Sequence, residues 1–189
     1  MKKLSNWLYS ICSTKLVIIS IIIFIIFMVG VLPIVSNYTA KITGGSESPD
    51  TSIIYKADDL YKMAHDYGVM GRKAYIVLRF TFDLLWPLAY LFFMVAVISK
   101  LLSWAVAENS KLRYLNLLPF LGALFDYLEN IGASIVVGRY PLKTAVIAEL
   151  TPIMTLLKWI FISGGFIVLI ALLLYHGYKL IVRIISDKR

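Results

Sequence analysis

The sequence is poor in charged residues and in cysteine. Only 16% of its 189 residues are charged, whereas 60% are hydrophobic, and the mean hydropathy is +0.81. A soluble domain needs a mostly polar exterior, which this composition does not supply. The single cysteine, Cys12, excludes an intrachain disulfide and any metal site built from several cysteines. The composition therefore predicts an integral membrane protein.

Histidine is also scarce, and the common catalytic motifs are missing. His65 and His176 are the only two histidines and are predicted to lie on opposite sides of the membrane, which argues against haem ligation or a histidine-rich metal site. The chain contains neither a GxxxxGK[ST] loop nor a GxSxG turn. We therefore expect no metal and no cofactor. The net charge of +8 comes from basic residues at the ends of apolar runs, so we expect no nucleic acid partner.

Four apolar runs are long enough to cross a bilayer. Each contains at least about 18 mostly apolar residues, the length expected of a membrane-spanning helix. They predict an all-α integral membrane protein, a four-transmembrane-helix bundle that forms one membrane domain over residues 1–189. The last helix is predicted to begin at Pro152, a residue favoured in the first turn. We place the four helices at about 15–36, 73–103, 115–138 and 152–182.

Lysine and arginine are distributed unevenly between the two sides of this bundle. With the N-terminus inside, the short inner connections hold more of them than the longer outer connections do. Because basic residues are retained on the cytoplasmic side, this distribution predicts that both termini are cytoplasmic. The expected location is the plasma (cytoplasmic) membrane.

The connection between the first two helices, residues 37–72, is predicted to face outward. Its first part is rich in glycine, serine, threonine and proline and is typical of coil. Asp58 and Asp59, followed by Gly68, then indicate a short amphipathic helix. The apolar residues of that helix, including Leu60 and Met63, would lie on the membrane surface.

The second apolar run carries a stripe of polar and aromatic residues. A charge at the bilayer centre costs about 2.5–3.5 kcal/mol even on the gentler scales, so such residues normally face a protein interior or a watery cavity. Arg79 and Asp83 are four residues apart and can form an ion pair. Pro87, four residues after Asp83, should kink the helix there. At 100° per residue, one face holds Arg72, Tyr75, Arg79, Asp83, Trp86 and Tyr90.

The third run also turns its polar residues to one side. Asp126, Glu129 and Asn130 share a face with the small residues Gly122 and Ala133. Small residues let a neighbouring helix approach closely in lipid. The polar residues of this helix are therefore predicted to face the other helices.

The fourth run places Thr155 and Lys158 on one face. Because a helix rises about 1.5 Å per residue, Arg79 lies roughly 10 Å below the outer surface. Lys158 and the charged residues of the other helices are likewise placed between the outer interface and the midplane, with Asp83 and Asp126 somewhat deeper. The sequence thus predicts one polar cavity in the outer half of the membrane. Its predicted residues are Arg72, Tyr75, Arg79, Asp83, Asp126, Glu129, Asn130, Thr155 and Lys158.

Such a cavity is compatible with three kinds of function. The first is binding or transport of a small polar molecule, a lipid headgroup or a proton. The second is an intramembrane enzyme that acts on a lipid-like substrate, with Asp126 or Glu129 as general acid or base. The third is a non-catalytic subunit or assembly factor whose buried charges hold the helices together. Membrane lipids are the expected partners, together with a second copy of the chain or another membrane protein.

Overall fold

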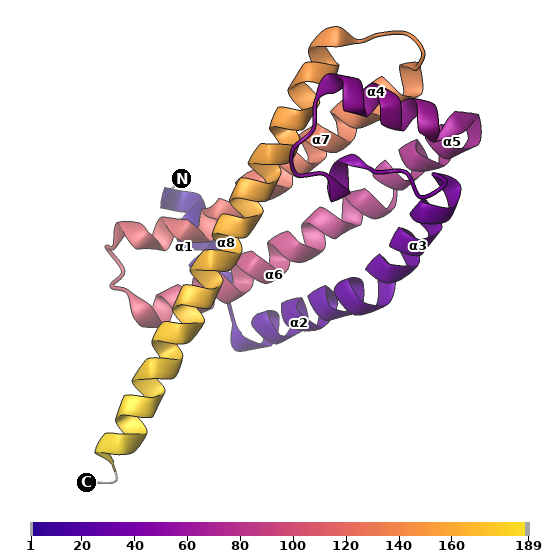
Figure 1. Cartoon of the computed structure of the whole chain (residues 1–189). Helices are drawn as coiled ribbons and strands as arrows, with labels where there is room; N and C mark the ends of the chain where they lie inside the picture. The colour runs from indigo at the N-terminus through magenta and orange to yellow at the C-terminus, as the bar shows by residue number, and fades with distance from the viewer. Residues whose placement is uncertain (1, 188–189) are drawn as a thin grey trace.

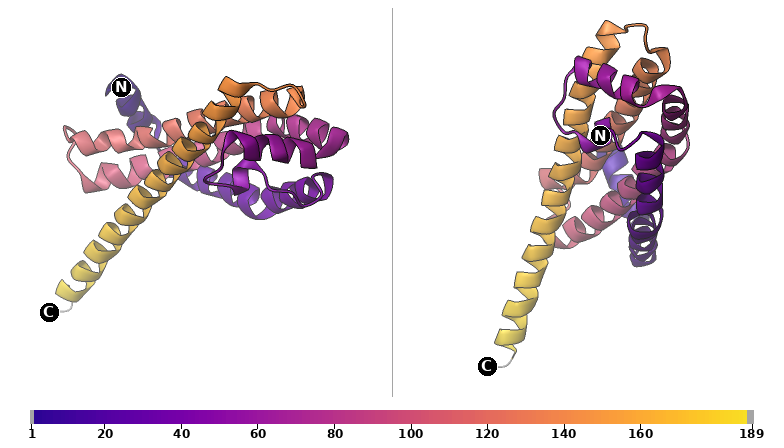
Figure 2. Two further views of the ribbon diagram at one scale, coloured as in Figure 1. Left: turned by 45° about the horizontal axis from the view of Figure 1, so that its top comes forward. Right: turned by 45° about the vertical axis from the view of Figure 1, so that its right-hand side comes forward.

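The computed structural model describes residues 2–187, which form helices and connecting loops and no strand. Within that range, four helices are long and apolar enough to cross a membrane, which confirms the all-helical class and the four predicted membrane-crossing helices. The last of them projects beyond the others at its C-terminal end (Figures 1 and 2). The four helices comprise residues Thr14–Ile42, Gly68–Ala105, Lys111–Arg139 and Ala145–Ser186.

The first membrane-crossing helix follows a short helix, α1 (Lys2–Ile11), and consists of α2 (Thr14–Ile25), the π-helical segment η1 (Ile26–Val31) and α3 (Leu32–Ile42). It continues past residue 36, where the sequence was expected to leave the helix. Helical structure ends only before Gly44 and Gly45, which have φ angles of +65° and +76°. Only glycine adopts this conformation without strain, so these residues set the end of the helix.

The second membrane-crossing helix is interrupted. Its parts are α5 (Gly68–Arg79) and α6 (Phe82–Ala105), and the break lies at Phe80 and Thr81, before the position predicted from Pro87. Pro87 itself lies inside α6. The Thr81 hydroxyl donates a 2.7 Å hydrogen bond to the Val77 carbonyl. It thereby satisfies a carbonyl at the end of α5 and stabilises the interruption at this point.

The last two membrane-crossing helices are α7 (Leu118–Arg139), which follows the 3₁₀ segment η3 (Lys111–Leu117), and α8 (Ala145–Ser186). The predicted start of the fourth helix at Pro152 was wrong, because Pro152 lies inside α8. The preceding residues include the strong helix formers alanine, glutamate and leucine. In addition, the Tyr61 hydroxyl accepts a 2.7 Å hydrogen bond from the Thr144 N–H, just before the helix begins.

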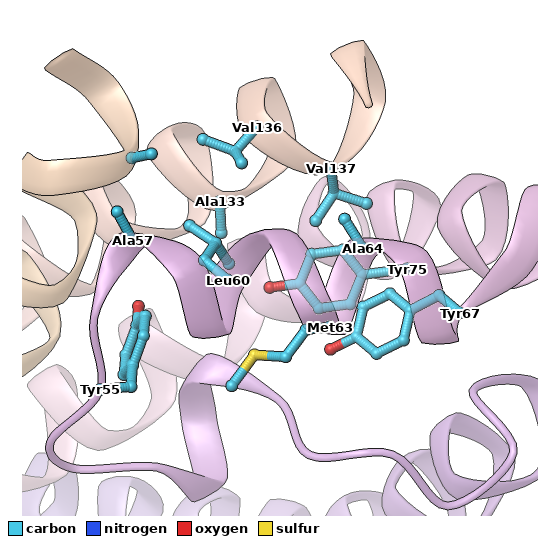
Figure 3. Close-up of a cluster of buried hydrophobic side chains, with 11 residues drawn as sticks. Tyr55, Ala57, Leu60, Met63, Ala64, Tyr67, Tyr75, Ala133, Val136 and Val137 are labelled. Atoms are coloured by element: carbon cyan, nitrogen blue, oxygen red, sulfur yellow. The ribbon is translucent and has the colours of Figure 1, made fainter. Parts of the chain in front are cut away.

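The helix α4 (Ala57–Asp66) lies in the connection between the first two membrane-crossing helices. Its residues Leu60, Met63 and Ala64 are buried in a cluster with side chains of α5 and α7. Figure 3 shows Leu60 beside Ala133, and Ala64 between Tyr75 and Val137, within this cluster. The apolar face of α4 therefore packs on the protein and not on the membrane surface, because α5 and α7 offer it an apolar partner.

Close contacts hold α7 against α8. A Cβ atom added at Gly132 would lie only 2.5 Å from the Thr151 hydroxyl oxygen, and one added at Gly122 would lie 2.9 Å from Ile162 Cγ1. Both positions thus require glycine, as expected of helices that pack closely in lipid. This packing turns the polar face of α7 towards Lys158 on α8.

Candidate functional site

Six charged side chains meet where α5, α6, α7 and α8 approach one another. Five of them belong to the membrane-crossing helices and are at most 7% exposed. The sixth comes from the loop between α3 and α4. We refer to these residues as the charge cluster: Asp50, Arg79, Asp83, Asp126, Glu129 and Lys158.

The ammonium group of Lys158 lies among three carboxylates. Its Nζ is 2.7 Å from Glu129 Oε2, 3.2 Å from Asp50 Oδ1 and 4.0 Å from Asp126 Oδ1. Lys158 lies in the fourth turn of α8, so this helix brings the cation to the acids of α7. Lys158 is only 3% exposed and therefore does not extend to the membrane surface.

The guanidinium of Arg79 forms the second half of the cluster. Its Nε lies 2.9 Å from Asp83 Oδ2, across the interruption between α5 and α6. Its Nη1 pairs with Asp50 and donates a 3.2 Å hydrogen bond to Asn130 Oδ1. The plane of the group lies over the ring of Tyr75, with Cζ 4.6 Å from the ring centroid.

Asn130 connects the two halves of the cluster. Its oxygen accepts from Arg79, and its Nδ2 donates a 3.2 Å hydrogen bond to Asp126 Oδ1. The other oxygen of Asp126 accepts a 3.0 Å hydrogen bond from the Tyr90 hydroxyl. Both oxygens of this buried carboxylate are therefore hydrogen-bonded, as a charge or a polar group in a low-dielectric interior requires.

Asp50 is the member of the cluster that the sequence did not predict. It lies in a short 3₁₀ turn, Pro49–Thr51, where the sequence was expected to form coil. Its Oδ2 pairs with Arg79 and its Oδ1 accepts a 3.2 Å hydrogen bond from Lys158. Desolvation alone would raise the pKa of Asp50, but the two cations outweigh it and hold that pKa well below its usual range. An isolated acid in a loop has no periodicity that could have placed it here.

Four of the predicted site residues are not members of the charge cluster: Tyr75 and Asn130 contact Arg79, whereas Arg72 and Thr155 are held elsewhere. Arg72 donates a 3.0 Å hydrogen bond to the Ala64 carbonyl and lies over the ring of Tyr140, so it holds α4 in place. Thr155 is fully buried, but its hydroxyl faces the Tyr55 hydroxyl at 2.8 Å and donates to the Thr151 carbonyl. These contacts explain why neither side chain reaches the charges.

A cavity of about 640 Å³ adjoins the charge cluster. It lies between the first membrane-crossing helix and the helices α6 and α8, and the loop between α3 and α4 covers one end. Its polar end is lined by Asp50, Arg79, Asp83, Asp126 and Lys158. Its apolar walls include Phe24, Met28, Leu32, Trp86, Ile162 and Phe166. Charged and apolar side chains therefore line the same cavity.

Acids outnumber bases in the cluster. Its four carboxyl groups and two basic groups give a formal charge of −2 when every group is ionised. Within residues 2–187, no group of three or more histidine, cysteine, aspartate or glutamate side chains is arranged to hold a metal ion. The ion pairs of Arg79 and Lys158 are thus the main source of charge balance at this site.

Comparison with known proteins gives no match for this chain. A scan against protein-family models, a search of curated proteins and a search of solved structures each found no match for this chain. The function is therefore argued from the geometry of the site alone.

Proposed function

We propose that this chain is a membrane protein that binds an amphiphilic molecule in the cavity beside the charge cluster. The polar group of the ligand lies among Asp50, Arg79 and Lys158, and its apolar part extends along Trp86 and Phe166. The observation that carries this proposal is that one cavity is charged at one end and lined by aromatic and aliphatic side chains elsewhere. Its volume lies in the range of sites that hold small molecules.

The distribution of lysine and arginine supports an orientation with both termini in the cytoplasm. In that orientation the charge cluster lies in the extracytoplasmic half of the membrane, because the loop that contains Asp50 connects the outer ends of the first two membrane-crossing helices. We propose the plasma membrane as the location. A lipid of the outer leaflet would then lie at the same depth as the cavity.

A binding role fits the geometry better than a purely structural or a catalytic one. Buried charges that only hold helices together need no cavity beside them, whereas Arg79 and Lys158 line one. For catalysis, an acid or base must reach the bound molecule. Glu129 is fully buried and does not line the cavity, and both oxygens of Asp126 accept hydrogen bonds from the protein.

The proposal is tested by filling the cavity. Met28 lines it, whereas its neighbour Val29 is 72% exposed and does not. We expect Met28→Trp to abolish the binding of co-purified amphiphiles and Val29→Trp to preserve it. The measurement is native mass spectrometry of each variant purified in mild detergent, with the bound molecules extracted and identified. Equal retention by both variants, or no bound molecule in the unsubstituted protein, would overturn the proposal.

A further inference from the structure

Asp50 differs from the rest of the charge cluster in its position and its exposure. The other five residues lie on membrane-crossing helices, and their side chains are at most 10% exposed. Asp50 belongs to the loop that covers the cavity, and its side chain is 35% exposed. It is therefore the member of the cluster that can leave without the movement of a membrane-crossing helix.

The carboxylate of Asp50 bridges two cations that come from separate helices. One oxygen pairs with Arg79 on α5, and the other lies 3.2 Å from Lys158 on α8. Two oxygens of a ligand carboxylate, or two non-bridging oxygens of a phosphodiester, have the same arrangement. Such groups are the ones that arginine and lysine bind most strongly.

If Asp50 leaves the cluster, each of the two cations still has one carboxylate partner. Arg79 keeps Asp83 at 2.9 Å, and Lys158 keeps Glu129 at 2.7 Å. A monoanion that replaces the Asp50 carboxylate restores the same formal charge to the cluster. A neutral headgroup would leave the donor groups that Asp50 had paired on Arg79 and Lys158 without an anionic acceptor in a low-dielectric site, which is unfavourable.

The loop around Asp50 forms one end of the cavity. Glu47, Ser48 and Thr51 line it beside Asp50. The loop begins at Gly44 and Gly45, which tolerate a wide range of backbone conformations. A headgroup that takes the place of Asp50 therefore needs to displace this loop alone.

From this geometry we infer that the cavity selects amphiphiles with a monoanionic headgroup, a carboxylate or a phosphodiester, and that this headgroup binds Arg79 and Lys158 by displacing Asp50. The inference rests on the proposed function, because it names the ligand class and the regulation of the same cavity. Asp50 thus competes with the headgroup of the ligand for Arg79 and Lys158. Its removal should strengthen the binding of anionic amphiphiles, although Asp50 is itself a residue of the site.

The test uses three photoreactive probes with the same diazirine-bearing alkyl chain: a fatty acid, an alkyl methyl phosphate diester and a fatty alcohol. The full chain is placed in phosphatidylcholine nanodiscs, and probe attachment to cavity residues is measured by mass spectrometry. If the Asp50-free state is a minor one, of 10% or less, Asp50→Asn should raise the apparent affinity for an anionic probe about tenfold or more. The affinity for the fatty alcohol, which does not have to displace Asp50, should change much less.

Matched variants separate this effect from a general change of charge. Asp58→Asn removes an exposed acid from α4 and should change the affinity for none of the probes. Arg79→Gln and Lys158→Gln should each weaken binding of the anionic probes. A gain with only the fatty acid or only the phosphodiester would identify the natural headgroup as that one class.

Hydrogen exchange of the unsubstituted protein provides a second measurement that does not depend on the folding of a variant. An anionic probe should increase amide exchange in residues 48–52, and the fatty alcohol should not. If the probes label the cavity but neither Asp50→Asn nor hydrogen exchange shows these effects, the inference that the headgroup displaces Asp50 is wrong. The proposal that the cavity binds amphiphiles is then still supported. If no probe labels the cavity, both the displacement of Asp50 and the proposed function are wrong.

Discussion

Lys158 on α8 and Glu129 on α7 form a buried ion pair, with Nζ 2.7 Å from Oε2 and neither residue more than 3% exposed. The pair joins the two helices at the level of the charge cluster. In apolar surroundings the contribution of this ion pair to stability depends on both partners, because removal of either one leaves the other as an uncompensated buried charge.

This pair leads to a prediction about stability. Lys158→Met leaves Glu129, Asp50 and Asp126 close together without their shared cation, so it should destabilise the protein by about 3–5 kcal/mol. Adding Glu129→Gln should recover part of the loss, because the two effects are not additive for residues in contact. Thermal unfolding in detergent micelles measures both. Lys179→Met, an exposed change on the same helix, should have little effect, and an equal loss in this control would contradict the prediction.

A second prediction concerns the contact between α7 and α8. Gly132→Ala places a methyl group 2.5 Å from the Thr151 hydroxyl oxygen. Overpacking of this kind costs about 1–3 kcal/mol, so the melting temperature should fall. Gly177→Ala is the matched control, because a Cβ atom there meets nothing within 4 Å. It should be neutral or slightly stabilising, since alanine favours helix more than glycine does.

A third prediction concerns pH. Because Arg79 and Lys158 hold the pKa of Asp50 below its usual range, ionised Asp50 stabilises the folded state. This contribution is complete above the unfolded-state pKa of about 3.9 and is lost as pH falls through the lower folded-state pKa. The difference in melting temperature between the unsubstituted protein and Asp50→Asn should therefore be constant near neutral pH and shrink below about pH 4. A difference that grows with acid would show that Asp50 is not held ionised.

A fourth prediction separates folding from binding by comparing two buried asparagines. Asn130 links Arg79 to Asp126, whereas Asn116 donates a 3.2 Å hydrogen bond to Ser99 in a polar network that does not line the cavity. Replacing either residue by leucine leaves buried partners unsatisfied and should cost about 1–3 kcal/mol. Only Asn130→Leu should also reduce amphiphile binding, measured by native mass spectrometry. Equal binding by the two variants would show that Asn130 does not organise the site.

Helical periodicity was sufficient to predict which charged residues of the membrane-crossing helices come together. Arg79, Asp83, Asp126, Glu129 and Lys158 were expected to share one level. The structure brings Arg79 within ion-pairing distance of Asp83, and Lys158 within that distance of Asp126 and Glu129. This prediction works because a charge in lipid must face inward, and the helix then fixes both its direction and its depth.

Other parts of the structure depend on contacts that periodicity does not encode. Asp50 reaches the cluster because a loop folds over the cavity, and Arg72 is drawn away from the cluster by the carbonyl of Ala64. The early start of α8 also escaped prediction, because helix-forming residues and a tyrosine hydroxyl outweigh the preference of Pro152 for a first turn. These outcomes depend on tertiary packing between segments far apart in the chain.

The first membrane-crossing helix supplies one wall of the cavity through Phe24 and Met28, while neighbouring residues such as Val29 are exposed on its outer side. A ligand dissolved in the bilayer would therefore be separated from the cavity by the width of a single helix. For such a molecule the relevant abundance is its mole fraction in the leaflet, and its solubility in water has no bearing on occupancy. The protein would then respond to a change in leaflet composition even when the surrounding solution stays the same.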